Sequence, residues 1–115
     1  MFNQILQLNQ IEKQALKEFK NQLIKKFGSN LVILKLFGSK ARGDFHKESD
    51  IDVLVIIKNL NQKDKKWIIE LTYELLLKYN DINISPRIYS ENTWKYYASL
   101  PLSFTYIVEK EGIKL

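Results

Sequence analysis

The stretch LFGSKARGDFHKESDIDVLVIIK, residues 36–58, contains the features that decide the fold. One apolar run ends at Gly38-Ser39, and a second begins at the acidic pair Asp50 and Asp52. Residues i and i+2 of a strand share a face and lie about 6.5–7 Å apart. The two carboxylates are therefore expected to point to the same side, at the start of a strand that is otherwise suited to burial.

These residue types suit a phosphate group and its metal ion. Two neighbouring carboxylates repel each other unless a cation lies between them, and Mg²⁺ prefers carboxylate, water and phosphate oxygens. Gly38 has no Cβ, so a ligand can approach its backbone closely, and the Ser39 hydroxyl can donate to a phosphate oxygen. If a helical turn starts there, its free N–H groups point at the same place. The plainer interpretation is that Gly38-Ser39 is a turn and that Ser49-Asp50 leads into the strand, which leaves Asp52 unexplained.

Outward from this stretch, the apolar spacing predicts a succession of helices and strands. Steps of three and four residues indicate helices, and short branched or alternating apolar runs indicate strands. The predicted helices are 8–27, 65–79, 91–99 and 101–110, and the predicted strands are 31–37, 52–58 and 81–90. Residues 111–115 are expected to form a terminal extension.

Three details refine this prediction. The run 52–58 is apolar on both faces, which is typical of a central, covered strand. Pro86 lacks an N–H group, so the strand 81–90 is expected at an edge or with a bulge. Ser90 is expected to cap the helix that follows it, and Pro101 to lie in the first turn of the last helix. The fold class is α/β, with a small mixed sheet packed against helices.

Composition limits the kind of protein. A chain of 115 residues can build one sizeable core, so we expect a single domain over residues 1–115. The chain has no cysteine, no signal-peptide pattern and no apolar run of about 20 residues, which fits a cytoplasmic location. A net charge of +5 favours an acidic partner such as a nucleotide, a nucleic acid or an acidic protein. The lysines also fit solvated helix faces, however, and that is the simpler explanation.

The combined pattern is more specific than its parts. Gly38-Ser39, the spaced pair Asp50 and Asp52, and the hydrophobic strand after them resemble the signature of the polymerase-β-like nucleotidyltransferases. More closely, the chain resembles the minimal nucleotidyltransferases, small proteins often paired with a HEPN-type partner. The segments LFGSKARGD, ESDIDVLV, ELLLKY, ISPRIYS and EGIKL occur in the order expected for that family. The resemblance covers nearly the whole chain and implies the polymerase-β-like nucleotidyltransferase fold.

The resemblance implies a role for each residue of the motif. Gly38 and Ser39 would hold the triphosphate of ATP, and Arg42 would contact phosphate unless it serves as a structural hydrogen-bond donor. Asp50 and Asp52 would bind two Mg²⁺ ions, one at the attacking hydroxyl and one at the departing pyrophosphate. The reaction would be an in-line attack on the α-phosphorus that places AMP on an acceptor.

One part of the family's pattern is not matched clearly. Members with the complete set of acids carry a third carboxylate on a later strand, next to the first two. By strand parity Asn83 stands where that acid is expected, and an amide supplies no negative charge. Asp81 would be a third metal ligand only if the strand begins early enough to bring it alongside Asp52; otherwise it is an exposed turn residue. The protein is then either a weak enzyme or an inactive one that has kept metal or nucleotide binding.

Three functions remain open from the sequence. The first is transfer of AMP to a tyrosine hydroxyl of a HEPN ribonuclease toxin, with this protein as its antitoxin. The second is an antitoxin that neutralises the HEPN partner by direct binding. The third is nucleotidyl transfer to a small molecule or to RNA, although the length leaves no separate acceptor domain. A HEPN toxin, in a homo- or hetero-oligomer, is the expected partner, whereas a membrane or a directly bound nucleic acid is not expected.

Other polar residues carry weaker expectations. His46 is expected to be a solvated loop residue rather than a catalytic one. Arg87 could approach the site from the third strand or simply cover a face of the sheet. Lys40 is assigned no role. The aromatic residues of 91–99 follow helical spacing, so we expect a core or a partner interface rather than base stacking.

Overall fold

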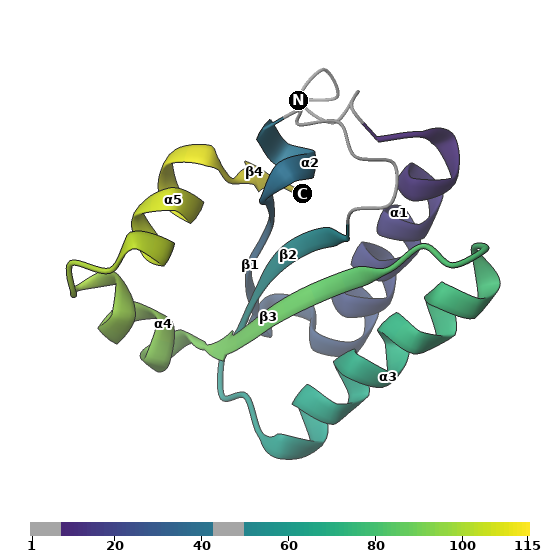
Figure 1. Ribbon diagram of the computed structural model, residues 1–115. Helices are drawn as coiled ribbons and strands as arrows, with labels where there is room; N and C mark the ends of the chain where they lie inside the picture. Colours follow the sequence, from purple (N-terminus) through teal and green to yellow (C-terminus); the bar gives the residue numbers. More distant parts are fainter. Residues whose placement is uncertain (1–7, 43–49) are drawn as a thin grey trace.

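The computed structural model describes residues 8–42 and 50–115. In that part of the chain a four-stranded sheet of order β3-β2-β1-β4 carries helices on both faces (Figure 1). The strands are β1 (Leu31–Phe37), β2 (Ile51–Ile57), β3 (Ile84–Ser90) and β4 (Ile113–Lys114). The helices are α1 (Gln10–Phe27), the 3₁₀ turn η2 (Gly28–Asn30), α2 (Ser39–Arg42), α3 (Gln62–Lys78), α4 (Glu91–Ala98) and α5 (Ser103–Glu111). None of these helices is both long and apolar enough to cross a membrane.

The sheet is mixed. β1 pairs antiparallel with β2 and with β4, whereas β2 and β3 run parallel. β2 is therefore central, as predicted, and all its residues except Asp52 are buried. β3 lies at the end of the strand order, which confirms the edge position predicted from Pro86. The predicted α/β class is confirmed as well.

The two faces of the sheet bury different helices. On one face Val53 and Val55 belong to the larger apolar cluster, which includes Phe19 of α1 and Leu75 of α3. On the other face the smaller cluster is formed by Leu54 and Ile56 of β2 with one residue each from α4 and α5, Trp94 and Val108. Each such buried side chain contributes about 1.5–3 kcal/mol to folding. Strand parity puts Asp52 on the side of Leu54, so its carboxylate faces the α4–α5 side.

Side-chain caps fix where the helices begin. Asn9 and Glu12 form a capping box at α1, and Asn61 and Asp64 form another at α3, because the first-turn N–H groups lack partners within the helix. These caps place the helix starts at residues 10 and 62, not at the predicted 8 and 65. Ser90 Oγ accepts a hydrogen bond of 3.1 Å from the Thr93 N–H, which confirms the predicted cap of α4.

The chain after α3 corrects three predictions. β3 begins at Ile84 rather than at residue 81, because Asn80 and Asp81 have φ values of +55° and +67° and turn the chain out of the helix. Pro101 lies before α5, which begins at Ser103, and not in its first turn. The expected terminal extension forms β4, since residues 113–114 pair with β1.

Candidate functional site

Gly38, Asp50 and Asp52 lie at the end of the sheet where β1 ends and β2 and β3 begin (Figure 1). Phe37, the last residue of β1, lies opposite Asp52 in the antiparallel pair, and Asp52 lies beside Ser85 in the parallel pair. Gly38 directly follows Phe37. The glycine turn and the acidic pair are thus neighbours in space although a long segment separates them in the sequence.

Gly38 allows the Asp52 carboxylate to lie against the backbone. Its φ of +76° is left-handed, a conformation that favours glycine. A Cβ at this position would overlap Asp52 Oδ2 and would stand 3.2 Å from Asp52 Cγ. Both the backbone angle and the space therefore require glycine. The chain then turns at once into α2, where the Ala41 N–H donates to the Gly38 carbonyl at 3.1 Å.

The helical turn considered after Gly38 is present. The backbone of Ser39 and Arg42 forms the two ends of α2. The side chains of Ser39 and Arg42 lie outside the part that the structure describes, as does all of 43–49, including His46. The phosphate contacts assigned to Ser39 and Arg42, and the loop position of His46, therefore stay predictions.

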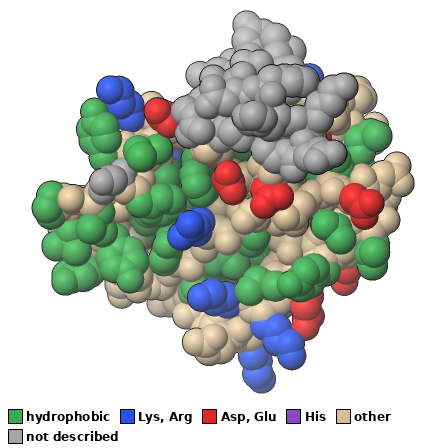
Figure 2. All heavy atoms as spheres, viewed as in Figure 1, with side chains coloured by type: hydrophobic (Ala, Val, Ile, Leu, Met, Phe, Trp, Pro, Cys, Tyr) green, Lys and Arg blue, Asp and Glu red, His purple; other side chains and the backbone are tan. Residues whose placement is uncertain are grey.

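The two aspartates differ in their surroundings. Asp52 lies within β2 and is half-buried, whereas Asp50 precedes the strand and is exposed. The Asp50 Oδ1 accepts a hydrogen bond of 2.9 Å from the Asn83 Nδ2, and the Ile51 N–H donates to the Asn83 carbonyl at 2.9 Å. Figure 2 shows acidic side chains in the middle of the face that is turned to the viewer, with Lys and Arg side chains beside them.

A third acid would have to stand on the segment that lies beside Asp50 and Asp52. In this protein that segment contributes Asn83 beside Asp50 and Ser85 beside Asp52. Asp81 lies earlier, in the turn after α3, where its N–H donates to the Leu76 carbonyl at 2.8 Å. The described residues contain no group of three or more His, Cys, Asp and Glu side chains that could hold a metal. Asp81 as a third ligand stays a prediction, and the early strand start on which it depended is absent.

The donor set that remains fits magnesium. Proteins usually hold Mg²⁺ through one or two carboxylates and leave the other positions to substrate phosphates and water. Asp52 offers a carboxylate directly against the Gly38 turn, and Asp50 offers a second, exposed carboxylate just before β2. These two side chains are the ones that would hold the ion, with a phosphate bound at the Gly38 turn completing its ligands.

Aromatic and basic side chains extend the same face away from the acids. Strand pairing places Arg87 of β3 beside Leu54, on the Asp52 side of the sheet. Its guanidinium lies 5.3 Å from the centre of the Phe104 ring, and that ring lies 5.5 Å from the ring of Phe37. Arg87 thus covers part of the sheet face, as considered, and also lies on the face of the site. Trp94 is a core residue.

Sequence reasoning missed one charged pair. The Lys40 ammonium forms an ion pair of 2.8 Å with Glu12, and both side chains are almost completely buried. The spacing Asn9 to Glu12 could have shown the capping box. No local pattern could have shown that Glu12 meets a lysine of α2, because the two residues come from separate segments.

Known proteins are similar to this one over most of its length. The family model described as "Nucleotidyltransferase domain" matches residues 8–113. The "Putative protein adenylyltransferase MJ0141" of Methanocaldococcus jannaschii is 38% identical over 103 residues, which are 89% of this chain and 96% of that protein. A second protein of that organism, "Putative protein adenylyltransferase MJ0604", is 44% identical over 68 residues, 59% of this chain and 64% of its own length.

Solved structures share the fold at low sequence identity. A "putative nucleotidyltransferase" from Sulfolobus solfataricus superimposes with a TM-score of 0.50 at 18% identity, covering 93% of this chain and 87% of that one. A chain from the crystal structure of a "toxin-antitoxin with AMP-PNP" gives a TM-score of 0.51 at 21% identity, covering 85% of this chain and 70% of that one. At these identities the likeness concerns the fold.

Proposed function

Because this chain belongs to the nucleotidyltransferase domain family, we propose that it transfers AMP from ATP to a hydroxyl group of a partner protein. The chain is a nucleotidyltransferase; the nucleotide, the metal and the acceptor are the proposed parts. The names of its relatives, protein adenylyltransferases, support a protein acceptor. The fold shared with toxin–antitoxin proteins, one of them crystallised with AMP-PNP, supports a toxin as partner and an adenine nucleotide as substrate.

The observation that carries this proposal is the contact between Asp52 and the Gly38 turn. The Asp52 carboxylate lies against the Gly38 backbone at the start of α2, and Asp50 stands two residues before it in the chain. When bound, Mg²⁺ would neutralise phosphate charge and favour an ionised acceptor hydroxyl. Asp50 and Asp52 would hold it, and the Gly38 turn would bind phosphate oxygens.

The reaction is a substitution at the α-phosphorus of ATP. The acceptor oxygen forms a new bond to the α-phosphorus, the bond between the α-phosphorus and the bridging oxygen breaks, and pyrophosphate leaves. The acceptor proton passes to solvent or to a nearby carboxylate. Positioning and charge stabilisation carry most of the catalysis in such transfers, which fits a site with few chemical groups. We propose the tyrosine of a HEPN ribonuclease toxin as acceptor.

Intact-mass spectrometry of the partner tests the proposal. A HEPN protein encoded beside this chain is incubated with ATP, Mg²⁺ and either the wild-type protein or the Asp50→Asn/Asp52→Asn variant. We expect mass gains of one or more AMP groups with the wild type alone. An unmodified partner in both reactions, under conditions where the two proteins bind each other, would reject adenylyl transfer.

A second candidate is an antitoxin that acts by binding alone. It is favoured by Asn83, an amide at the place of the third acid. Protection of cells from the toxin distinguishes the two functions, because a binding-only antitoxin protects fully as the Asp50→Asn/Asp52→Asn variant. Transfer-dependent protection is lost in that variant.

A further inference from the structure

Glu12 and Lys40 form a buried ion pair beside the glycine turn. The Lys40 Nζ lies 2.8 Å from Glu12 Oε2, and the side chains are only 6% and 5% exposed. The other carboxylate oxygen, Oε1, accepts the Asn9 N–H at 2.9 Å, and Asn9 Oδ1 accepts the Glu12 N–H at 2.8 Å. One carboxylate therefore joins the first turn of α1 to α2.

The energy of such a pair indicates a role other than general stability. Removing two charges from water costs several kcal/mol per ion, and their attraction only offsets this cost when the geometry is good. In proteins, apolar residues of similar volume in place of a buried ion pair are often equally or more stabilising. A charged pair instead holds the two elements that carry it in one relative position, because a shift of α2 would leave the Lys40 ammonium buried away from Glu12.

The ion pair holds α2, a helix with little stability of its own. α2 has four residues, far fewer than the roughly 12–15 that an isolated helix needs to be even marginally stable in water. Its place therefore depends on the contacts of its side chains. Lys40 is its second residue, directly after Ser39 and close to Gly38, whose backbone faces the Asp52 carboxylate.

We propose that Glu12 and Lys40 are positioning residues that hold the Gly38-Ser39 turn against Asp52 and so set the affinity for the nucleotide's phosphates. This inference rests on the proposed function. It also gives Lys40, to which the sequence assigned no role, a structural one: its ammonium is turned inward to Glu12.

Three variants and one control test the pair. The single changes Glu12→Gln and Lys40→Met break it, and Glu12→Met/Lys40→Met replaces it with apolar side chains that leave no buried charge. Glu18→Gln is the control, because it breaks another ion pair of α1, the one between Glu18 and Lys78 on α3. The dissociation constant of MgATP is measured by calorimetry, and the free energy of unfolding by denaturant titration.

We expect the two single variants to bind MgATP about tenfold or more weakly while folded, since losing one hydrogen bond to a charged phosphate group lowers affinity by about tenfold or more. The double variant should regain the free energy of unfolding, apart from the capping bond that Glu12 accepts from the Asn9 N–H, but not the affinity. In transfer assays the loss should appear mainly in KM for ATP. Glu18→Gln should bind as the wild type does.

Unchanged MgATP affinity in the folded variants would overturn the inference, and so would a double variant that regains stability and affinity together. If the single variants do not fold, the double variant decides, because it contains no unpaired charge. Failure of the wild-type protein to bind MgATP would reject the proposed function itself, and this inference with it.

Discussion

At the scale of single residues, the site depends on how closely Asp52 approaches Gly38. The glycine has a left-handed φ and no room for a Cβ on the side of the Asp52 carboxylate. Strain of this kind costs about 1–3 kcal/mol where another residue is forced into it. The backbone conformation at Gly38 therefore affects where the Asp52 carboxylate lies.

Gly38→Ala is expected to abolish AMP transfer, because the new Cβ must displace Asp52 or the turn. Gly28→Ala is the matched control: Gly28 also has a positive φ, +55°, but a Cβ there meets nothing within 4 Å. Both variants should lose about 1–3 kcal/mol of unfolding free energy. Only Gly38→Ala should lose activity at matched folded fraction, so equal activity losses would contradict the role of the Asp52 contact.

Asn83 offers a gain-of-function test. Asn83→Asp places a carboxylate beside Asp50, in exchange for a hydrogen bond of 2.9 Å. Without divalent ions the variant should lose about 0.5–1.5 kcal/mol of unfolding free energy through the lost bond, with a small further loss from the new repulsion. Mg²⁺ should then raise its Tm more than that of the wild type. Asn83→Ala removes the same bond without adding charge, and an equal Mg²⁺ response of the two variants would argue against a metal site here.

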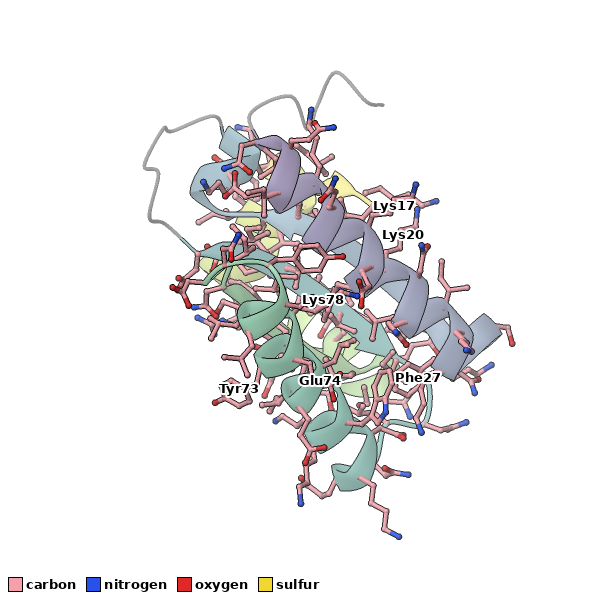
Figure 3. All side chains as sticks on the ribbon, turned by 90° about the vertical axis from the view of Figure 1, so that its right-hand side faces the viewer. Lys17, Lys20, Phe27, Tyr73, Glu74 and Lys78 are labelled. Carbon is pink, nitrogen blue, oxygen red and sulfur yellow. The ribbon has the colours of Figure 1, made fainter. Side chains whose placement is uncertain are left out.

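At the scale of elements, a polar cluster joins α1 to the end of α3 (Figure 3). Glu18 Oε1 accepts hydrogen bonds from Lys78 Nζ at 2.8 Å and from Tyr79 Oη at 2.6 Å. The bond from Lys78, followed by that from Tyr79, lowers the pKa of Glu18 below its ordinary value of 4.5. The same Glu18 carboxylate raises the pKa of Lys78 and of Tyr79.

This cluster predicts a pH dependence of stability. A carboxyl group whose pKa is lowered by folding stabilises the fold above its unfolded pKa, and the effect is lost as the pH falls through the folded pKa. Glu18→Gln should therefore lower Tm by a few degrees at most at neutral pH, because the ion pair is largely exposed. Its difference from the wild type should shrink below pH 4.5. A difference that stays constant in thermal scans from pH 7 to pH 3 would contradict this assignment.

At the scale of the whole molecule, the site lies between two cores of unequal size. α1 and α3 build the larger cluster on one face of the sheet, and α4 and α5 build the smaller one on the other (Figure 1). Asp52 lies on the side of the smaller cluster. The layer beside the site therefore has fewer buried contacts, and we expect it to open more readily than the opposite layer.

Hydrogen exchange followed by mass spectrometry tests this division. Trp94→Ala, in the smaller cluster, should cost about 3–5 kcal/mol locally and reduce amide protection in α4 and α5, with α1 and α3 still protected. Leu75→Ala, in the larger cluster, should reduce protection throughout the described part of the chain. Equal loss in all helices of the Trp94→Ala variant would mean that the two cores unfold as one.

Much of the fold and part of the site followed from local pattern. β1 has its predicted bounds, β2 is shifted by one residue, and Gly38, Asp50 and Asp52 meet at one sheet edge. Apolar spacing and strand parity predicted the strands because they depend on neighbours in the chain, whereas the meeting of Gly38 with the acidic pair was implied by the family resemblance. Asp81 shows the limit of parity: the alternation of 81–90 looks like one strand, yet a left-handed turn delays its start to Ile84.

The sequence by itself determined the order of the main helices and strands and the central position of β2, because burial and backbone preference act over a few residues, and its resemblance to a known family implied the glycine turn beside the acidic pair. Only the tertiary structure decided that Asn83 stands beside Asp50, that residues 113–114 pair with β1 and that Glu12 meets Lys40. These contacts join segments far apart in the chain. Their register follows from how the helices pack on the two faces of the sheet, and no local pattern of residues encodes that packing.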